Sequence, residues 1–188
     1  MNRAVFLDRD GTINRDSLYA YKIEDFVFLP GVKEGLKKLQ ALSFKLIVIT
    51  SQSGIARGFY TEEDLEKVHA YMRSALEKEG VHLDAVYYCP HHPEAGNERY
   101  RKVCDCRKPK IGLFLEAKKR FDIDLKKSYM IGDRSKDMAA GKTAGCTTIY
   151  LDVPKPDDHE LKAAPDYSVK NFPEAVQVIL ERESSSAF

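Results

Sequence analysis

The chain has 188 residues, and its 30 Lys and Arg residues almost balance its 29 Asp and Glu residues, so the formal net charge at pH 7 is +1. This balance gives no overall field that would recruit nucleic acid or an anionic membrane, and the length suits one domain with a substantial core. No apolar run approaches the roughly 18 residues of a membrane span, and the chain starts with a strand pattern rather than a signal peptide. We therefore expect a cytoplasmic protein.

Short apolar runs and amphipathic helical segments alternate along the chain. Strands are expected at 5–7, 44–50, 83–88, 128–133, 146–151 and 167–169. Helices are expected at about 31–42, 61–80, 111–121, 134–144 and 173–183. This alternation predicts a single α/β domain over residues 1–183, a Rossmann-like three-layer sandwich with a mainly parallel sheet, followed by a frayed tail at 184–188. The irregular segment 13–29 is expected to form a flap that faces the substrate.

Three of the expected strands end in polar residues. Asp8 and Asp10 follow the first strand, Thr50 ends the second, and Asp133 ends the fourth. Because parallel strands bring their carboxyl ends to one edge of a sheet, these groups are expected to converge there. Clustered carboxylates repel one another without a cation, and hard oxygen ligands suit Mg²⁺. The alternative is that Asp8 and Asp10 are turn and capping residues.

A positively charged residue, Lys108, precedes the fourth strand and lies next to Arg107. An ammonium group among aspartates can hold a phosphoryl oxygen and offset the negative charge that accumulates as a nucleophile approaches a phosphate. Hydrolysis of a phosphate monoester is among the slowest uncatalysed reactions, so it needs a nucleophile, an acid/base group, a metal and a cation together. The sequence offers candidates for the nucleophile, the acid/base group, the ligands of the metal and the cation.

Three of the four cysteines lie in one loop at 89–107, which we call the cysteine loop. Two cysteines, a histidine and a third cysteine form a complete tetrahedral zinc set with no position left for water, so we expect a structural Zn²⁺. His92 is the alternative histidine ligand, and a disulfide is the alternative to metal binding. The fourth cysteine, Cys146, falls in a strand and is expected to be buried and inert. The expected zinc ligands are Cys89, His91, Cys104 and Cys106.

The segment 8–12 (DRDGT), Thr50, Lys108 and the segment 132–137 together resemble the four ordered motifs of the haloacid dehalogenase (HAD) superfamily of phosphatases. The resemblance implies that Asp8 attacks phosphorus to form an aspartyl-phosphate and that Asp10 protonates the leaving group and then activates water. Thr50 and Lys108 would bind the transferring phosphoryl group. The implied Mg²⁺ ligands are Asp8, the backbone carbonyl of Asp10, and Asp133. For Asp137 two interpretations stay open, a place beside these ligands or a helix-start role.

The cysteine loop narrows the resemblance from the HAD superfamily to one family within it. With TSQSGIARG at 50–58 and CDCRKP at 104–109, the chain is similar to the heptose bisphosphate phosphatases, a HAD family. The similarity implies a cytoplasmic, monomeric enzyme that removes the C7 phosphate of a heptose 1,7-bisphosphate during the synthesis of nucleotide-activated heptose for bacterial surface glycans. It also implies that a large cap domain is absent and that the flap and the cysteine loop shape the entrance.

The same similarity implies a set of sugar-phosphate contacts. Arg107 suits the second, non-reacting phosphate because a guanidinium binds phosphate oxygens bidentately. Ser51 stands where related enzymes often carry Asn, and Arg134 where some carry Lys, so both are expected to influence substrate or anomer preference. The implied contacts are Asp16, Tyr19, Ser51, Gln52, Ser53, Arg107 and Arg134.

Three other functions remain open. Zinc-bearing histidinol-phosphate phosphatases share the motif frame, although the segment 51–58 favours the heptose enzymes. The chain could also be a binding module without activity, whose loop is held by zinc. Such a module would not require Asp10, the second aspartate of the DRDGT segment, so the presence of Asp10 argues against it. A polynucleotide-end phosphatase is disfavoured by the near-neutral charge.

Overall fold

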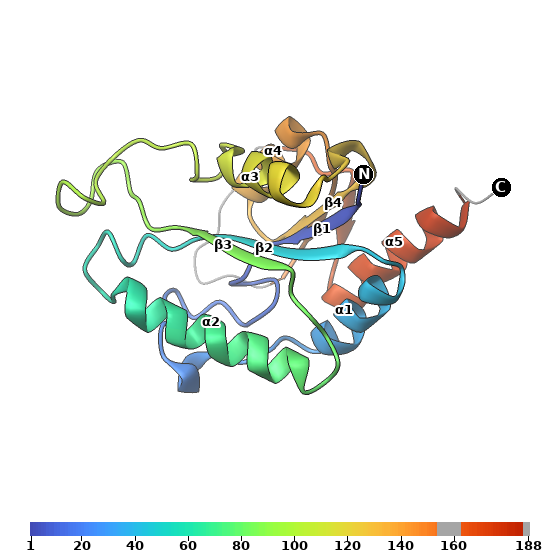
Figure 1. The fold of residues 1–188 in the computed structure, drawn as a ribbon, viewed down its shortest axis with the longest axis horizontal. Coiled ribbons are helices and arrows are strands. Elements are labelled where there is room, and N and C mark those ends of the chain that lie inside the picture. Colours follow the sequence, from blue (N-terminus) through green and yellow to red (C-terminus); the bar gives the residue numbers. More distant parts are fainter. Residues whose placement is uncertain (154–162, 186–188) are drawn as a thin grey trace.

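The computed structural model describes residues 1–153 and 163–185. Its centre is a six-stranded sheet with the strand order β3-β2-β1-β4-β5-β6, in which every neighbouring pair is parallel. Figure 1 shows the sheet between two layers of helices, which confirms the predicted three-layer α/β class. The strands are β1 (Ala4–Leu7), β2 (Lys45–Ser51), β3 (Ala85–Cys89), β4 (Tyr129–Gly132), β5 (Thr147–Leu151) and β6 (Tyr167–Val169).

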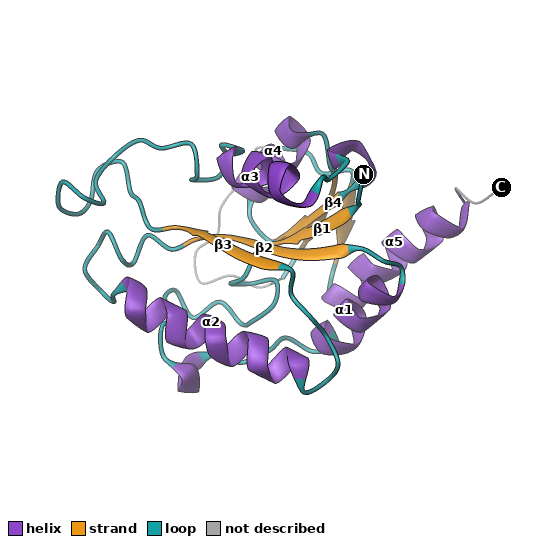
Figure 2. Cartoon of the chain, in the orientation of Figure 1, coloured by secondary structure: helices purple, strands orange, loops and turns teal. Residues whose placement is uncertain are grey.

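The helices cover both faces of the sheet, with α3 and α4 on one face and α1, α2 and α5 on the other (Figure 2). Two short 3₁₀ helices, Ile23–Asp25 and Leu125–Lys127, were not expected. The described residues contain no separate cap domain. The helices are α1 (Val32–Ala41), α2 (Glu62–Glu77), α3 (Gly112–Phe121), α4 (Ser135–Ala144) and α5 (Phe172–Ser185).

Strand β1 is buried along its whole length because it packs against both helical layers. Val5 and Leu7 belong to the core under α1, α2 and α5, whereas Ala4 and Phe6 belong to the core under α3. This division follows from the alternation of side chains along a strand. An entirely apolar strand at the centre of the sheet holds the residue after it, Asp8, at a defined position.

Helix α2 begins at the predicted capping box, in which Thr61 and Asp64 bond to each other's backbone N–H groups. Helix α5 ends at Ser185, two residues inside the segment that we expected to be frayed, and 186–188 lie outside the described residues. Among the described helices, none combines the length and the apolar character needed to cross a membrane.

The strand order reverses direction between β1 and β4. The chain runs outward from β1 to β3 on one side, then returns and runs from β4 to β6 on the other. Loops that leave the carboxyl ends of β1 and β4 therefore diverge and open a crevice, which is where open α/β sheets bind their ligands.

Candidate active site

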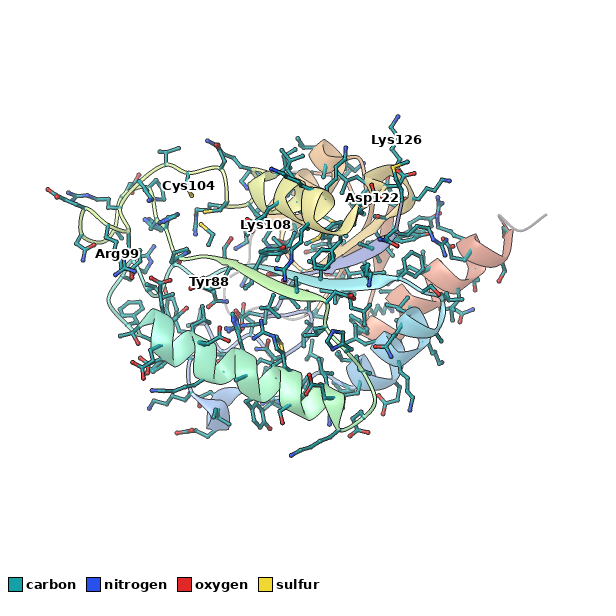
Figure 3. The ribbon with its side chains drawn as sticks, viewed as in Figure 1. Tyr88, Arg99, Cys104, Lys108, Asp122 and Lys126 are labelled. Carbon is teal, nitrogen blue, oxygen red and sulfur yellow. The ribbon has the colours of Figure 1, made fainter. Side chains whose placement is uncertain are left out.

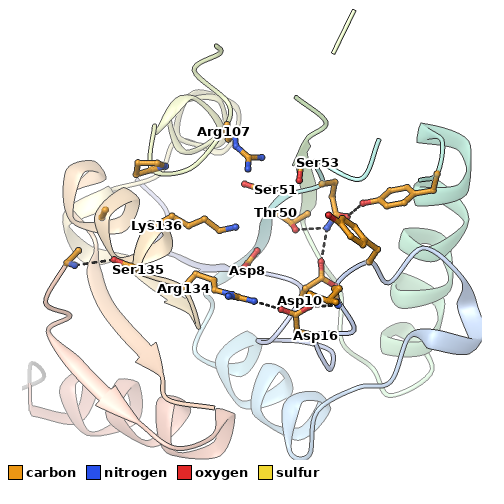
Figure 4. Close-up of a pocket in the computed structure, with 17 residues that line it drawn as sticks. Asp8, Asp10, Asp16, Thr50, Ser51, Ser53, Arg107, Arg134, Ser135 and Lys136 are labelled. Atoms are coloured by element: carbon orange, nitrogen blue, oxygen red, sulfur yellow. Dashed lines mark hydrogen bonds and ion pairs between the residues drawn. The ribbon is translucent and has the colours of Figure 1, made fainter. Parts of the chain in front are cut away.

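A cavity of about 700 Å³ lies at this crevice. Ten of the residues predicted from the sequence line it, and Figure 4 shows their side chains around the opening. They are Asp8, Asp10, Asp16, Tyr19, Thr50, Ser51, Gln52, Ser53, Arg107 and Arg134. Lys108 and Asp133 are buried next to it, at 3% and 0% exposure.

Lys108 connects two acidic residues at the base of the cavity. Its Nζ lies 2.8 Å from Asp8 Oδ1 and 2.7 Å from Asp137 Oδ1, and it donates to the carbonyl of Ile49 at 2.7 Å. Burial alone would lower the pKa of Lys108, but the attraction of Asp137 and Asp8 outweighs burial and raises it. Lys108 is therefore a fixed ammonium ion in direct contact with Asp8.

The carboxylates of Asp8, Asp133 and Asp137 form a buried cluster in which one oxygen from each lies within 4.8 Å of the others. Burial, and then the negative charge of Asp137, raise the pKa of Asp8, while Lys108 and Lys136 oppose this rise. Such a set of hard oxygen donors suits Mg²⁺. The position of Asp137 supports both open interpretations, because it also accepts from the backbone N–H of Arg134 at the start of α4, at 3.0 Å.

Gly11 is required for the close approach of the two acidic strand ends. Its φ angle is +80°, and a Cβ atom there would overlap the carboxylate of Asp133. The turn after β1 therefore lies directly against Asp133, the residue that follows β4.

Asp10 lies outside the carboxylate cluster, in a hydrogen-bond network of its own. Its oxygens accept from Arg9 Nη2 at 2.9 Å, from Asn14 Nδ2 at 2.9 Å and from Gln52 Nε2 at 2.9 Å. Burial would raise its pKa, but the charge of Arg9 and the bonds from Asn14, Arg9 and Gln52 outweigh burial and lower it. Gln52 also donates to Thr50 Oγ1 at 2.8 Å, so it ties the end of β2 to Asp10.

Sequence reasoning missed Arg9 and its partner His69. Arg9 has no exposed surface, and its Nη1 lies 3.3 Å from His69 Nε2 on α2. Only two features of the sequence could have pointed to this pair. They are a charged residue inside the DRDGT segment and a histidine within the apolar stripe of a helix. Other cavity residues were also missed, namely Leu18, Tyr60, Pro109, Ser135, Lys136, Ala139 and Ala163.

The flap is held across the cavity by one ion pair. Asp16 Oδ2 lies 2.6 Å from Arg134 Nη2, although the two residues are 118 positions apart. Tyr19 packs edge-on against Phe59, with ring centroids 4.7 Å apart. These contacts place the two predicted flap residues at the cavity opening.

The cysteine loop gathers the four predicted zinc ligands. The Sγ atom of Cys106 lies 3.0 Å from that of Cys89 and 3.3 Å from that of Cys104, and the Nδ1 atom of His91 lies 3.2 Å from Cys106 Sγ. Ligands about 2.0–2.3 Å from a tetrahedral zinc are separated by roughly 3.4–3.8 Å, so the donor set fits a zinc ion after small shifts.

The alternatives for this loop are wrong. All four cysteines are free thiols, so no disulfide closes it. His92 is not part of the metal-binding group, and its Nδ1 accepts from the backbone of Ala95 at 2.9 Å. Cys146 is buried, as expected, and burial raises the pKa of its thiol to about 12. Arg107 Nη1 donates to the carbonyl of His91 at 3.1 Å, so the loop supports a cavity residue directly.

A buried aspartate backed by lysine at the switch point of a parallel α/β sheet defines a HAD-type phosphohydrolase. A family model described as HAD-hydrolase-like matches residues 105–175. The D-glycero-beta-D-manno-heptose-1,7-bisphosphate 7-phosphatase of Escherichia coli O6:H1 is 42% identical over 181 residues, which are 96% of this chain and 95% of that protein. The enzyme of the same name from Haemophilus ducreyi is 48% identical over 79% of this chain and 82% of its own length.

Solved structures of HAD phosphatases are also similar to this chain. The D,D-heptose 1,7-bisphosphate phosphatase from B. bronchiseptica, complexed with magnesium and phosphate, has a TM-score of 0.79 and 25% identity, over 96% of this chain and 99% of its own. A HAD-like phosphatase from Mesorhizobium loti reaches a TM-score of 0.82 and 30% identity, over 96% and 85% of the two chains. The chain belongs to the heptose-1,7-bisphosphate 7-phosphatase family of the HAD superfamily.

Proposed function

We propose that this protein is a Mg²⁺-dependent phosphatase that removes the C7 phosphate of D-glycero-D-manno-heptose 1,7-bisphosphate and leaves heptose 1-phosphate. The observation that carries the proposal is the contact between Asp8 and Lys108 at the base of the cavity, in a chain that shares 42% identity with an enzyme of this name over 96% of its length. We place it in the synthesis of nucleotide-activated heptose, upstream of bacterial surface glycans.

In the proposed first step, a carboxylate oxygen of Asp8 attacks phosphorus and the bond from phosphorus to the C7 oxygen breaks. The carboxyl group of Asp10 gives its proton to the leaving alkoxide. A phosphate dianion close to Asp10 favours this protonated form, against the lowering effect of Arg9. Lys108 and Thr50 hold oxygens of the transferring group, and the ammonium of Lys108 offsets their growing charge.

In the second step, water attacks the phosphorus of the aspartyl-phosphate and Asp10 takes the proton from that water. The bond from phosphorus to Asp8 breaks, which releases inorganic phosphate and restores both aspartates. Arg9 and Gln52 hold the Asp10 carboxylate in one orientation for both proton transfers.

We infer that Asp8, the backbone carbonyl of Asp10, and Asp133 bind Mg²⁺. The ion would neutralise phosphate charge and orient the group for in-line attack. Asp137 would act through its contact with Lys108, which lies 2.7 Å away.

We further infer that Cys89, His91, Cys104 and Cys106 bind a structural Zn²⁺. Because Arg107 and Lys108 follow the last of these ligands directly, an ordered loop would keep both cations at the cavity. Since the site requires reduced thiols, we propose a cytoplasmic location. We also propose that residues 1–183 form one domain that works as a monomer.

The test is phosphate release with Mg²⁺ from both anomers of heptose 1,7-bisphosphate, from fructose 1,6-bisphosphate and from histidinol phosphate. Selective turnover of one heptose anomer is expected. Selective turnover of histidinol phosphate would support the proposed mechanism but would show that the substrate is histidinol phosphate rather than a heptose bisphosphate. No turnover by protein that has bound both metals would contradict the proposed activity and favour a binding module.

A further inference from the structure

Two of the basic residues at the cavity are already neutralised by acidic neighbours. Lys108 is paired with two carboxylates and only 1% of its side chain is exposed. Arg134 is paired with Asp16. Neither residue has a free charge to offer a second phosphate without giving up an ion pair.

Two other cations at the cavity lack such neighbours. Within residues 1–153 and 163–185, neither Arg107 nor Lys136 lies within ion-pair distance of a carboxylate. The charge of Lys136 acts on Asp8 without a direct contact, and the side chain of Arg107 donates one hydrogen bond, to the carbonyl of His91. Both side chains are half-buried. A partly desolvated cation without a counter-charge is costly, so this arrangement is suited to an anion that arrives with the substrate.

Lys136 reaches the cavity from the first turn of α4, on a different wall from Arg107. Figure 4 shows its side chain extending across the cavity toward Asp8, with Arg107 on the far side of the opening. The first turn of a helix also carries a partial positive charge, which adds to the attraction of Lys136 for anions. The two cations therefore face one space from two sides.

We propose that Lys136 is a substrate-binding residue which, together with Arg107, holds the non-reacting phosphate of a bisphosphate substrate. This inference rests on the proposed phosphatase function and deepens it. The reacting phosphoryl group lies against Asp8 and Lys108 at the base, and the second phosphate bridges the ammonium of Lys136 and the guanidinium of Arg107 nearer the opening. Lys136 thus makes the enzyme selective for bisphosphates over monophosphates.

The experiment compares kcat/KM for heptose 1,7-bisphosphate and heptose 7-phosphate, which share the reacting phosphate and differ only in the second one. We expect Lys136→Gln to lower the ratio of the two values by about tenfold and Lys136→Arg to restore most of it. The inhibition constant of the product heptose 1-phosphate should rise by a similar factor in Lys136→Gln. The matched control is Lys126→Gln, an exposed lysine at the opposite edge of the sheet (Figure 3), which should keep the wild-type ratio.

If Lys136→Gln lowers kcat/KM equally for the bisphosphate and the monophosphate, the proposal is overturned, because Lys136 would then act at the reacting phosphate. An unchanged ratio would overturn it as well. If the wild-type protein hydrolyses neither heptose compound, the proposed function fails instead. The bisphosphate and monophosphate of the sugar that it does hydrolyse then provide the same ratio test for Lys136.

Discussion

Arg9 and Asp10, neighbours in the sequence, form a partly buried ion pair in which Arg9 Nη2 lies 2.9 Å from both carboxylate oxygens of Asp10. Adjacent residues at the end of a strand normally point to opposite sides. The turn after β1 instead folds Arg9 back beneath Asp10, where it also donates to the carbonyl of Ala20 at 2.9 Å. The proposed acid/base group is therefore held by the residue next to it in the chain.

We expect Asp10→Asn to reduce turnover by at least about 10²-fold, because an amide neither gives nor accepts a proton in the two steps. The amide keeps the size of the side chain but removes the counter-charge of the buried Arg9, so the thermal midpoint should fall, as for loss of Arg9. Mg²⁺ binding by the folded protein should change little, because the backbone carbonyl of this residue is retained. Phosphate release and a thermal melt followed by circular dichroism check both. Substantial remaining turnover would remove Asp10 from the acid/base role.

Arg9→Met should destabilise the protein by about 3–5 kcal/mol, because it leaves a largely buried carboxylate without its counter-charge. The matched control is Arg99→Met. Arg99 also forms an ion pair, with Glu62 at 2.8 Å, but its side chain is 74% exposed and lies at the tip of the cysteine loop (Figure 3). Its loss should cost less than about 1 kcal/mol. Urea unfolding measures both values, and similar costs for the two variants would contradict the assigned importance of Arg9.

His69 makes stability depend on pH. Burial, and then the positive charges of Arg9 and Arg73, lower the pKa of His69 to about 3, while Asp10 acts in the opposite direction. Glu66 on the same helix and Tyr88 on β3 are its other polar neighbours. Between pH 3 and pH 6.5 the unfolded chain binds a proton that the folded protein does not, so stability falls as pH falls through this range.

From these pKa values, His69 should lower the free energy of unfolding by about 2 kcal/mol between pH 7 and pH 5. We expect His69→Gln to lack this part of the pH dependence, since an amide does not titrate and its oxygen can still accept from Arg9. Urea unfolding at the two pH values checks the difference between the two proteins. The same pH dependence in both would show that His69 is protonated in the folded state.

Zinc should be present at one ion per chain and should be lost in Cys106→Ser. Because Arg107 and Lys108 follow this residue, loss of the ion should lower both the thermal midpoint and kcat/KM. Cys146→Ala, which removes a buried thiol outside the cluster, should keep the full zinc content. Elemental analysis of purified protein measures the metal. Wild-type activity in a zinc-free Cys106→Ser variant would show that the ion does not organise the active site.

The order of the elements and the chemistry at the strand ends were predictable from the sequence. Apolar runs that end in aspartate or threonine mark strands and their carboxyl ends. The spacing of Cys89, His91, Cys104 and Cys106 predicts a metal-binding set, and the structure brings these four side chains together. These signals are local, because they depend on side-chain periodicity and on ligand spacing within one loop. Similarly, Thr61 and Asp64 marked the start of α2 three residues apart.

Only the tertiary structure decided which side chains meet. The pairing of Asp16 with Arg134, the contact of Arg9 with His69, and the position of Asp137 beside Lys108 all join segments that lie far apart in the sequence. The open cavity position of Lys136 depends likewise on how α4 leaves β4 at the switch point. Such contacts follow from strand order and from the direction in which each turn aims its side chains, and neither is encoded in the pattern of any single segment.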